Sequence, residues 1–199
     1  MSIPKESITG LILAGGLGSR MGGVDKGLQD FGGMTMAAQV MQRLQPQVGT
    51  VLINANRHTD DYAKLGAPVV SDLIEGYAGP LAGLHAGLSR CATDYLVSAP
   101  CDSPLLPHDL VQRLSAALTE HQADAAVAVT GHGAGQRRHP VFMLIHSSLR
   151  EHLASYLHDG GRKVDGWLRS LHCIDVAFDD EHAFANANTR EELDALTRR

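Results

Sequence analysis

Residues 13–26 have the sequence Leu13-Ala14-Gly15-Gly16-Leu17-Gly18-Ser19-Arg20-Met21-Gly22-Gly23-Val24-Asp25-Lys26, and they follow the apolar run at residues 8–13. A short apolar run that ends in glycines is typical of a buried strand followed by a turn. Glycine allows a ligand to approach the backbone closely, because it has no Cβ. Exposed backbone N–H groups beside Arg20 and Lys26 favour a polyphosphate-binding loop over the alternative, a flexible surface turn.

The residues of this stretch do not fit two more common types of phosphate-binding loop. A Walker loop requires Ser or Thr directly after its lysine, but Lys26 is followed by Gly27. The dinucleotide fingerprint requires a third glycine at the position that Met21 occupies. The stretch therefore predicts phosphate binding of another class.

Apolar or β-branched runs alternate with helical patterns along the chain, which predicts an α/β fold with a mostly parallel central sheet flanked by helices. We expect strands at residues 8–13, 51–56, 68–72, 95–99, 125–129, 141–145 and 173–178. We expect helices at residues 34–44, 81–89, 110–118, 148–157, 164–171 and 189–196, with a further helical turn at 62–65.

Length and composition limit the class of protein. A chain of 199 residues is expected to form one domain, residues 1–199, and its net charge of −5 argues against a general nucleic-acid binder. The three cysteines are widely separated and lack zinc-ligand spacing, which favours reduced thiols in the cytoplasm. No apolar run approaches the roughly 20 residues of a membrane span, so we expect no membrane partner.

Polar residues follow three of the expected strands. Asn54, Asp72 and Asp102 occupy these positions, and ligands of parallel sheets bind beyond the carboxyl ends of the strands. Asp102 lies in a stiff turn between Pro100 and Pro104, where a carboxylate suits Mg²⁺; capping of the turn is the alternative. Asn54 and Asp72 suit the edge of a base or ribose, with local turn chemistry as the alternative.

Basic residues gather on two expected loops of the second half, in an otherwise acidic chain. They are Arg137, Arg138, His139, Arg162 and Lys163. Ligand contacts concentrate on loops, so this set suggests contacts to a second anionic substrate. A solvated charged face is the alternative.

Several of these motifs resemble one family. Leu13-Ala14-Gly15-Gly16, Arg20-Met21-Gly22 and Asp25-Lys26, at their spacing here, resemble the nucleotidyltransferase signature of molybdenum cofactor guanylyltransferases. The resemblance extends to Gly79-Pro80-Leu81, to the Pro-x-Asp-x-Pro turn around Asp102 and to Phe184-Ala185-Asn186-Ala187-Asn188-Thr189. It implies a Rossmann-like nucleotidyltransferase fold and a Mg²⁺-dependent enzyme that transfers GMP from GTP to the terminal phosphate of molybdenum-molybdopterin, releasing pyrophosphate.

The resemblance also implies roles for individual residues. The catalytic residues would be Arg20, Lys26 and Asp102, with Asp102 holding Mg²⁺. The GTP site would comprise Leu13, Ala14, Gly15, Gly16, Lys26, Asn54, Asp72 and Asp102. The acceptor side would comprise Arg137, Arg162, Lys163, Asn186 and Asn188. Residues 1–130 would thus serve mainly the nucleotide and 131–199 mainly the acceptor, and other proteins of molybdenum cofactor biosynthesis are suggested partners.

Other functions stay open at this point. One alternative is a related nucleotidyltransferase that uses CTP with molybdopterin or an NTP with a sugar phosphate. Another is a GTP-binding regulatory module without catalysis. The chain departs from the family pattern at Gly32-Gly33-Met34, where a Gly-Lys-Pro turn is common, and at His146, where relatives often have an aromatic residue. Both departures concern the fit of the acceptor.

Overall fold

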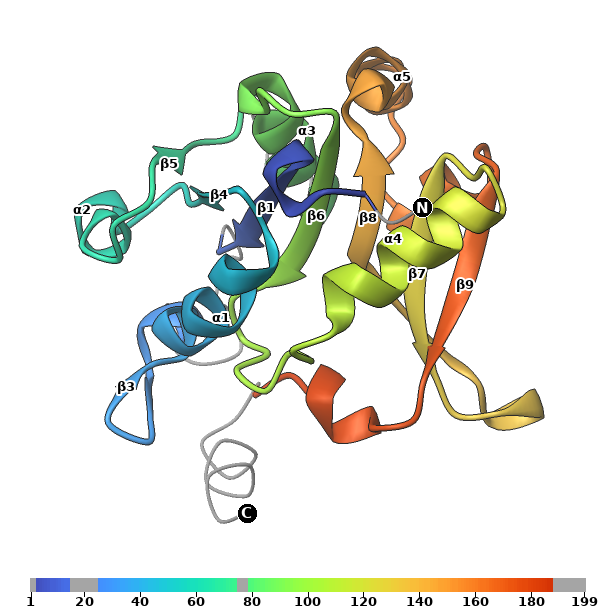
Figure 1. Cartoon of the computed structure of the whole chain (residues 1–199). Helices are drawn as coiled ribbons and strands as arrows, with labels where there is room; N and C mark the ends of the chain where they lie inside the picture. The colour runs from blue at the N-terminus through green and yellow to red at the C-terminus, as the bar shows by residue number, and fades with distance from the viewer. Residues whose placement is uncertain (1–2, 15–24, 75–78, 188–199) are drawn as a thin grey trace.

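The structure is a computed structural model that describes residues 3–14, 25–74 and 79–187. Within these residues one seven-stranded sheet runs through the molecule in the order β5-β4-β1-β6-β8-β7-β9 (Figure 1). The strands are β1 (Ile8–Leu13), β4 (Thr50–Asn54), β5 (Val69–Val70), β6 (Tyr95–Pro100), β7 (Ala125–Thr130), β8 (Arg137–His146) and β9 (Cys173–Phe178). All seven overlap predicted strands, but β8 begins four residues before the predicted strand at 141–145, so Arg137, Arg138 and His139 lie in a strand and not on the expected loop.

The sheet is mostly parallel, as predicted, and β8 is its antiparallel member. It pairs antiparallel with both β6 and β7. The connection from β7 to β8 spans residues 131–136, with a 3₁₀ turn, η5 (Gly133–Gly135), and is too short for the crossover that parallel pairing requires. The register of β8 against β7 shifts between Val127 and Ala128, which accommodates Pro140 in an irregular part of the ladder.

Helices cover both faces of the sheet. They are α1 (Met36–Leu44), α2 (Thr59–Ala63), α3 (Pro80–Arg90), α4 (Leu110–Glu120), α5 (Arg150–His158) and α6 (Val164–Leu168). Helices α1 and α4 lie on one face and α3 and α5 on the other (Figure 1). Successive side chains of β1 point to opposite faces of the sheet, so the strand contributes to both hydrophobic cores. Ile12 packs with α1 and α4, and Leu11 packs with α3 and α5. The buried Trp167 of α6 joins the second core.

Short elements complete the described chain. They are the 3₁₀ turns η1 (Lys5–Ser7), η3 (Lys26–Leu28), η4 (Gln45–Gln47), η6 (Ser147–Leu149) and η7 (Glu181–Phe184), and a hairpin of β2 (Asp30–Phe31) and β3 (Met34–Thr35). In the described parts of the chain, no helix has both the length and the apolar character that crossing a bilayer requires. All three cysteines are free thiols, as predicted.

Several predicted helices differ from the structure or lie outside it. The helical turn expected at 62–65 is α2, which spans Thr59–Ala63. The helix expected from residue 34 begins at Met36, because Met34 pairs in the hairpin and the Thr35 side chain caps the helix by accepting a hydrogen bond from the Ala38 amide at 3.2 Å. The helix expected over 164–171 ends at Leu168. The helix expected over 189–196 lies outside the described residues.

Candidate active site

The order of the strands defines where a ligand is expected to bind. From β1 the chain moves outward through β4 to β5 and then returns to β6 on the opposite side of β1. A reversal of this kind is the topological switch point at which α/β sheets bind ligands, beyond the carboxyl ends of the strands. Leu13 ends β1 and pairs with Asn54 on one side and with Pro100 on the other. The predicted meeting of strand ends is therefore confirmed.

Part of the predicted site lies outside the described residues. This applies to Gly15, Gly16 and Arg20 of the glycine-rich stretch and to Asn188 near the C-terminus. Leu13 and Ala14 lie at the start of that stretch, where the Ala14 amide donates to the Asn54 carbonyl at 2.8 Å and the Leu13 carbonyl accepts from the Cys101 amide at 3.0 Å. These bonds tie the end of β1 to both neighbouring strand ends.

Lys26 and Asp102 meet at the switch point. The Lys26 ammonium lies 3.4 Å from the Asp102 carboxylate, although the two residues are 76 positions apart in the chain. Both side chains are largely shielded, with 23% and 14% of their surface exposed. Burial raises the pKa of Asp102, and the neighbouring Lys26 charge opposes that increase. The structure thus places a cation and a desolvated carboxylate at one point.

Magnesium is the metal that the family resemblance implies. Among the described residues, no three His, Cys, Asp or Glu side chains gather in a way that could hold a metal ion. Mg²⁺ at a nucleotide site needs fewer protein ligands, however, because substrate phosphates and waters complete its octahedron around one or two carboxylates. Asp102 fits this type of site, since a carboxylate whose pKa is raised by burial gains stabilisation from a bound cation.

Asn54 and Asp72 contact each other beside the same strand ends. The Asn54 side-chain amide donates to Asp72 at 2.8 Å and to the Val70 carbonyl at 3.2 Å. Asn56 donates to the other carboxylate oxygen of Asp72 at 2.8 Å, and its own side-chain oxygen accepts from the Asp72 amide at 2.8 Å. The carboxylate is thus held in one orientation by two amides. A fixed acceptor of this kind suits the N–H groups of a base.

Helix α3 confines Asn54 from the other side. The helix begins at Pro80 after Gly79, whose φ of 71° is in a region that favours glycine. Gly83, one turn into the helix, lies so close to Asn54 and Leu13 that a Cβ at this position would overlap both side chains. Asn54 is consequently only 2% exposed and has little freedom to change its orientation.

The C-terminal segment approaches the Asp102 turn. The Ser103 hydroxyl donates to the Asn186 side-chain oxygen at 2.6 Å, and the Ala187 amide donates to the Asp102 carbonyl at 3.0 Å. Of the predicted acceptor residues, the structure therefore brings Asn186 next to the Lys26–Asp102 pair. Arg137 lies on an exposed strand end and pairs with Glu181, just before this segment, at 3.7 Å.

The remaining basic residues differ in their surroundings. Arg138 forms internal contacts, with its guanidinium 2.8 Å from Asp175, 3.6 Å from Asp165 and 2.9 Å from the Cys173 sulfur. His139 is buried, stacks on Phe184 and bonds to Thr130 at 2.8 Å. These two residues hold strands and the C-terminal segment together.

Arg162 and Lys163 are exposed and lie between α5 and α6. The Arg162 guanidinium donates to the carbonyls of Leu157 and Gly161, both at 2.7 Å, and is folded toward its own turn. A role in acceptor binding would use the other guanidinium nitrogens and the Lys163 ammonium.

We predict that Arg162→Ala combined with Lys163→Ala raises the KM for the acceptor substrate about tenfold or more and leaves GTP affinity nearly unchanged. A charge-assisted phosphate contact is worth about 1.5–3 kcal/mol, less where solvent screens it. Acceptor titrations of pyrophosphate release, run beside GTP calorimetry, measure both quantities. Arg169→Ala, an exposed arginine after α6, serves as the control. Unchanged acceptor use would identify a solvated basic turn, and a parallel loss of GTP affinity would assign the pair to the nucleotide.

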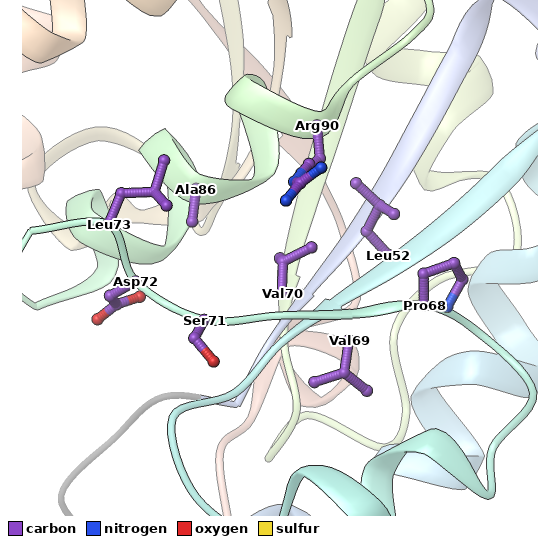
Figure 2. Close-up of a pocket in the computed structure, with 9 residues that line it drawn as sticks. All are labelled: Leu52, Pro68, Val69, Val70, Ser71, Asp72, Leu73, Ala86 and Arg90. Atoms are coloured by element: carbon purple, nitrogen blue, oxygen red, sulfur yellow. The ribbon is translucent and has the colours of Figure 1, made fainter.

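A cavity of about 560 Å³ lies beside the site, between β5 and α3 (Figure 2). Its lining combines apolar side chains, including Leu52, Val70 and Ala86, with polar ones, including Ser71, Asp72 and Arg90 of α3. Asp72 and Leu73 lie at one end and Pro68 at the other (Figure 2). The cavity therefore reaches the predicted nucleotide residues at Asp72 and otherwise follows the edge of the sheet.

Three residues of the site were missed by sequence reasoning. Asn56 orients Asp72, Ser103 holds Asn186, and Tyr62 contacts Asp25. Asn56 had a usable signal, since it lies two positions after Asn54 at the same strand end. Ser103 and Tyr62 are ordinary turn and helix residues in the sequence, and their partners lie 83 and 37 positions away.

Comparison with known proteins agrees with this geometry. The model of the MobA-like NTP transferase domain matches residues 10–174. The chain belongs to the MobA-like NTP transferase family. Among curated members, the molybdenum cofactor guanylyltransferase of Ralstonia nicotianae is 54% identical, with 99% of each chain covered. That of Cupriavidus metallidurans is 52% identical, with 96% of this chain and 95% of the relative covered.

Solved structures share the MobA-like NTP transferase fold. Molybdopterin-guanine dinucleotide biosynthesis protein A of Archaeoglobus fulgidus has a TM-score of 0.74 at 23% identity, with 96% of this chain and 97% of that chain covered. The 4-diphosphocytidyl-2C-methyl-D-erythritol synthase of Anaerococcus prevotii has a TM-score of 0.77 at 11% identity, with 98% of both covered. The predicted nucleotidyltransferase fold is confirmed.

Proposed function

We propose that this protein is a molybdenum cofactor guanylyltransferase, which transfers GMP from GTP to the terminal phosphate of molybdenum-molybdopterin and releases pyrophosphate. The observation that carries this proposal is the Lys26–Asp102 pair at the switch point of a fold shared with relatives of that name at 54% identity. GTP and the molybdopterin-type cofactor are then the two substrates, and other proteins of the same biosynthetic route are candidate partners.

The proposed reaction is a displacement at the α-phosphorus of GTP. A terminal phosphate oxygen of the acceptor forms the new bond, the bond from the α-phosphorus to the oxygen bridging to the β-phosphate breaks, and pyrophosphate leaves with that oxygen. Such a transfer depends mainly on alignment and on neutralisation of charge, so a covalent protein intermediate is not required.

Individual residues of the predicted site would supply distinct parts of this chemistry. Lys26 would stabilise the negative charge that gathers on the departing pyrophosphate, together with Arg20 and the amides near Gly15 and Gly16. Asp102 would hold Mg²⁺, which when bound neutralises phosphate charge. Asn54 and Asp72, with the backbone at Leu13 and Ala14, would bind the guanine nucleotide. Asn186, Asn188, Arg137, Arg162 and Lys163 would contact the acceptor.

The test of the proposed function is pyrophosphate release with GTP, CTP, UTP and ATP, each with and without molybdenum-loaded molybdopterin. We expect release only when GTP and the acceptor are both present. Release with CTP instead would identify a cytidylyltransferase. Release that requires a sugar phosphate would identify another member of the superfamily, and GTP binding without any turnover would indicate a regulatory module.

We predict that GTP raises the melting temperature of the protein far more than CTP does at equal concentration. The fixed Asp72 carboxylate matches the N–H donors of guanine, whereas the wrong base leaves polar groups of the site unpaired. Thermal denaturation across a nucleotide series measures the difference. Equal protection by both nucleotides would show that the site recognises the triphosphate alone.

A further inference from the structure

A tyrosine hydroxyl lies buried beside both catalytic turns. Tyr62 belongs to α2 and is fully buried, and its hydroxyl donates to the Asp25 carboxylate at 2.5 Å. The buried Cys101 packs in the same core as Tyr62, and its sulfur and the Tyr62 hydroxyl both lie against Gly27. Asp25 immediately precedes Lys26, and Cys101 immediately precedes Asp102. One side chain thus contacts the neighbours of both members of the ion pair.

The orientation of Asp25 shows that this contact replaces a more usual one. Asp25 stands at the N-cap position of η3, where an aspartate ordinarily accepts a hydrogen bond from an amide of the first turn. Its side chain makes no such cap bond and accepts from Tyr62 instead. The Asp25 carbonyl accepts from the Gln29 side chain at 3.2 Å and from the Leu28 amide at 3.3 Å, so the residue is held on both sides.

Gly27 permits the close packing of this region. A Cβ at position 27 would overlap the Tyr62 hydroxyl and would lie 3.0 Å from the Cys101 sulfur. The backbone around Lys26 therefore rests directly on Tyr62 and on the turn that carries Asp102. Any shift of Tyr62 is expected to move Lys26 relative to Asp102.

We propose that Tyr62 is a positioning residue, whose hydroxyl aligns Lys26 with Asp102 through Asp25 and Cys101. The inference builds on the proposed function, because it assigns Tyr62 a role in the same transfer. Tyr62 acts on the ion pair through Asp25, which precedes Lys26, and through Cys101, which precedes Asp102.

The test begins with Tyr62→Phe, which keeps the buried ring and removes the hydroxyl. We expect kcat for pyrophosphate release to fall about 10- to 100-fold, because small misplacement of an aligned group costs this much, while the KM for the acceptor stays within about twofold. Tyr95→Phe is the matched control, since Tyr95 lies on β6 beside His146 at the opposite end of the strand from Asp102. We expect it to retain wild-type kcat.

A double-mutant cycle with Lys26→Met separates positioning from a general structural role. If Tyr62 acts through Lys26, Tyr62→Phe lowers kcat in the wild-type background and has much less effect in the Lys26→Met background. Equal effects in both backgrounds, or no loss in Tyr62→Phe, would overturn the inference. Should Tyr62→Phe fail to fold, Asp25→Leu removes the same bond from the other side, and the same cycle decides.

GTP affinity provides a readout that does not depend on turnover. Calorimetry is expected to show that Lys26→Met weakens GTP binding in the wild type by a larger factor than in Tyr62→Phe. A wild-type protein that binds GTP but releases no pyrophosphate would contradict the proposed function. The double-mutant cycle measured by GTP affinity would still test the role of Tyr62. Equal weakening of GTP affinity in both backgrounds would overturn the positioning role alone.

Discussion

Replacement of Asp102 by Asn is expected to lower turnover by at least about a hundredfold while the protein remains folded. The amide has the size of the carboxylate but lacks the charge that would hold Mg²⁺ and that faces Lys26 at 3.4 Å. The backbone contacts of the turn, including the bond from the Ala187 amide to the Asp102 carbonyl, do not depend on the side chain and should persist. Steady-state pyrophosphate release at saturating GTP and Mg²⁺ measures the loss.

Asp94→Asn is the matched control for this variant, because Asp94 is an exposed aspartate before β6, whereas Asp102 follows that strand. It should retain wild-type turnover, and thermal denaturation should show both variants folded. Near wild-type turnover of Asp102→Asn at saturating Mg²⁺ would contradict both the metal assignment and the catalytic role of the ion pair.

Gly83→Ala is expected to weaken GTP binding by at least about tenfold and to destabilise the protein by roughly 1–3 kcal/mol, the usual cost of overpacking a tight contact. The added Cβ would overlap the Asn54 side chain and would lie 2.7 Å from a Leu13 methyl group. Asn54 would then lose its geometry toward Asp72, and with it the orientation of the predicted base-binding carboxylate. Calorimetry with GTP and urea denaturation measure the two effects.

Gly135→Ala is the control for steric specificity. A Cβ at Gly135 would meet nothing within 4 Å, so this variant should bind GTP as the wild type does. If Gly83→Ala bound GTP with unchanged affinity, Asn54 would have no part in nucleotide binding, whatever happened to the stability of the fold.

Features that depend on local sequence patterns could be predicted. The strands were visible as apolar runs, and the rule that parallel strands present their carboxyl ends together placed Asn54 and Asp72 at one edge, where they now lie 2.8 Å apart. The same rule placed Asp102 opposite the glycine-rich stretch, and Lys26 lies beside it. Such predictions need only the order and direction of strands.

Features that depend on distant partners could not be predicted. Arg138 had the pattern of an exposed loop cation, but strand β9 and helix α6 bring Asp175 and Asp165 to its guanidinium. Tyr62 was part of an unremarkable helical turn, because nothing near it in the chain indicates that Asp25 becomes its acceptor. In both cases the hydrogen-bond or ion-pair partner depends on the packing of elements that are far apart in the sequence.

The tight fit of Gly27 against Tyr62 and Cys101 also limits which residue types can follow Lys26. A Walker loop places its lysine and its metal-ligating hydroxyl on adjacent residues of one loop. Here a hydroxyl-bearing side chain has no room after Lys26, so cation and carboxylate come from segments that follow two neighbouring strands. The contact of Gly27 with Tyr62 and Cys101 holds these two segments together, beside the ladder that joins β1 and β6 from Ile8 to Leu13. A side chain added at position 27 is therefore expected to change the distance between the two charges, although neither charged residue is altered.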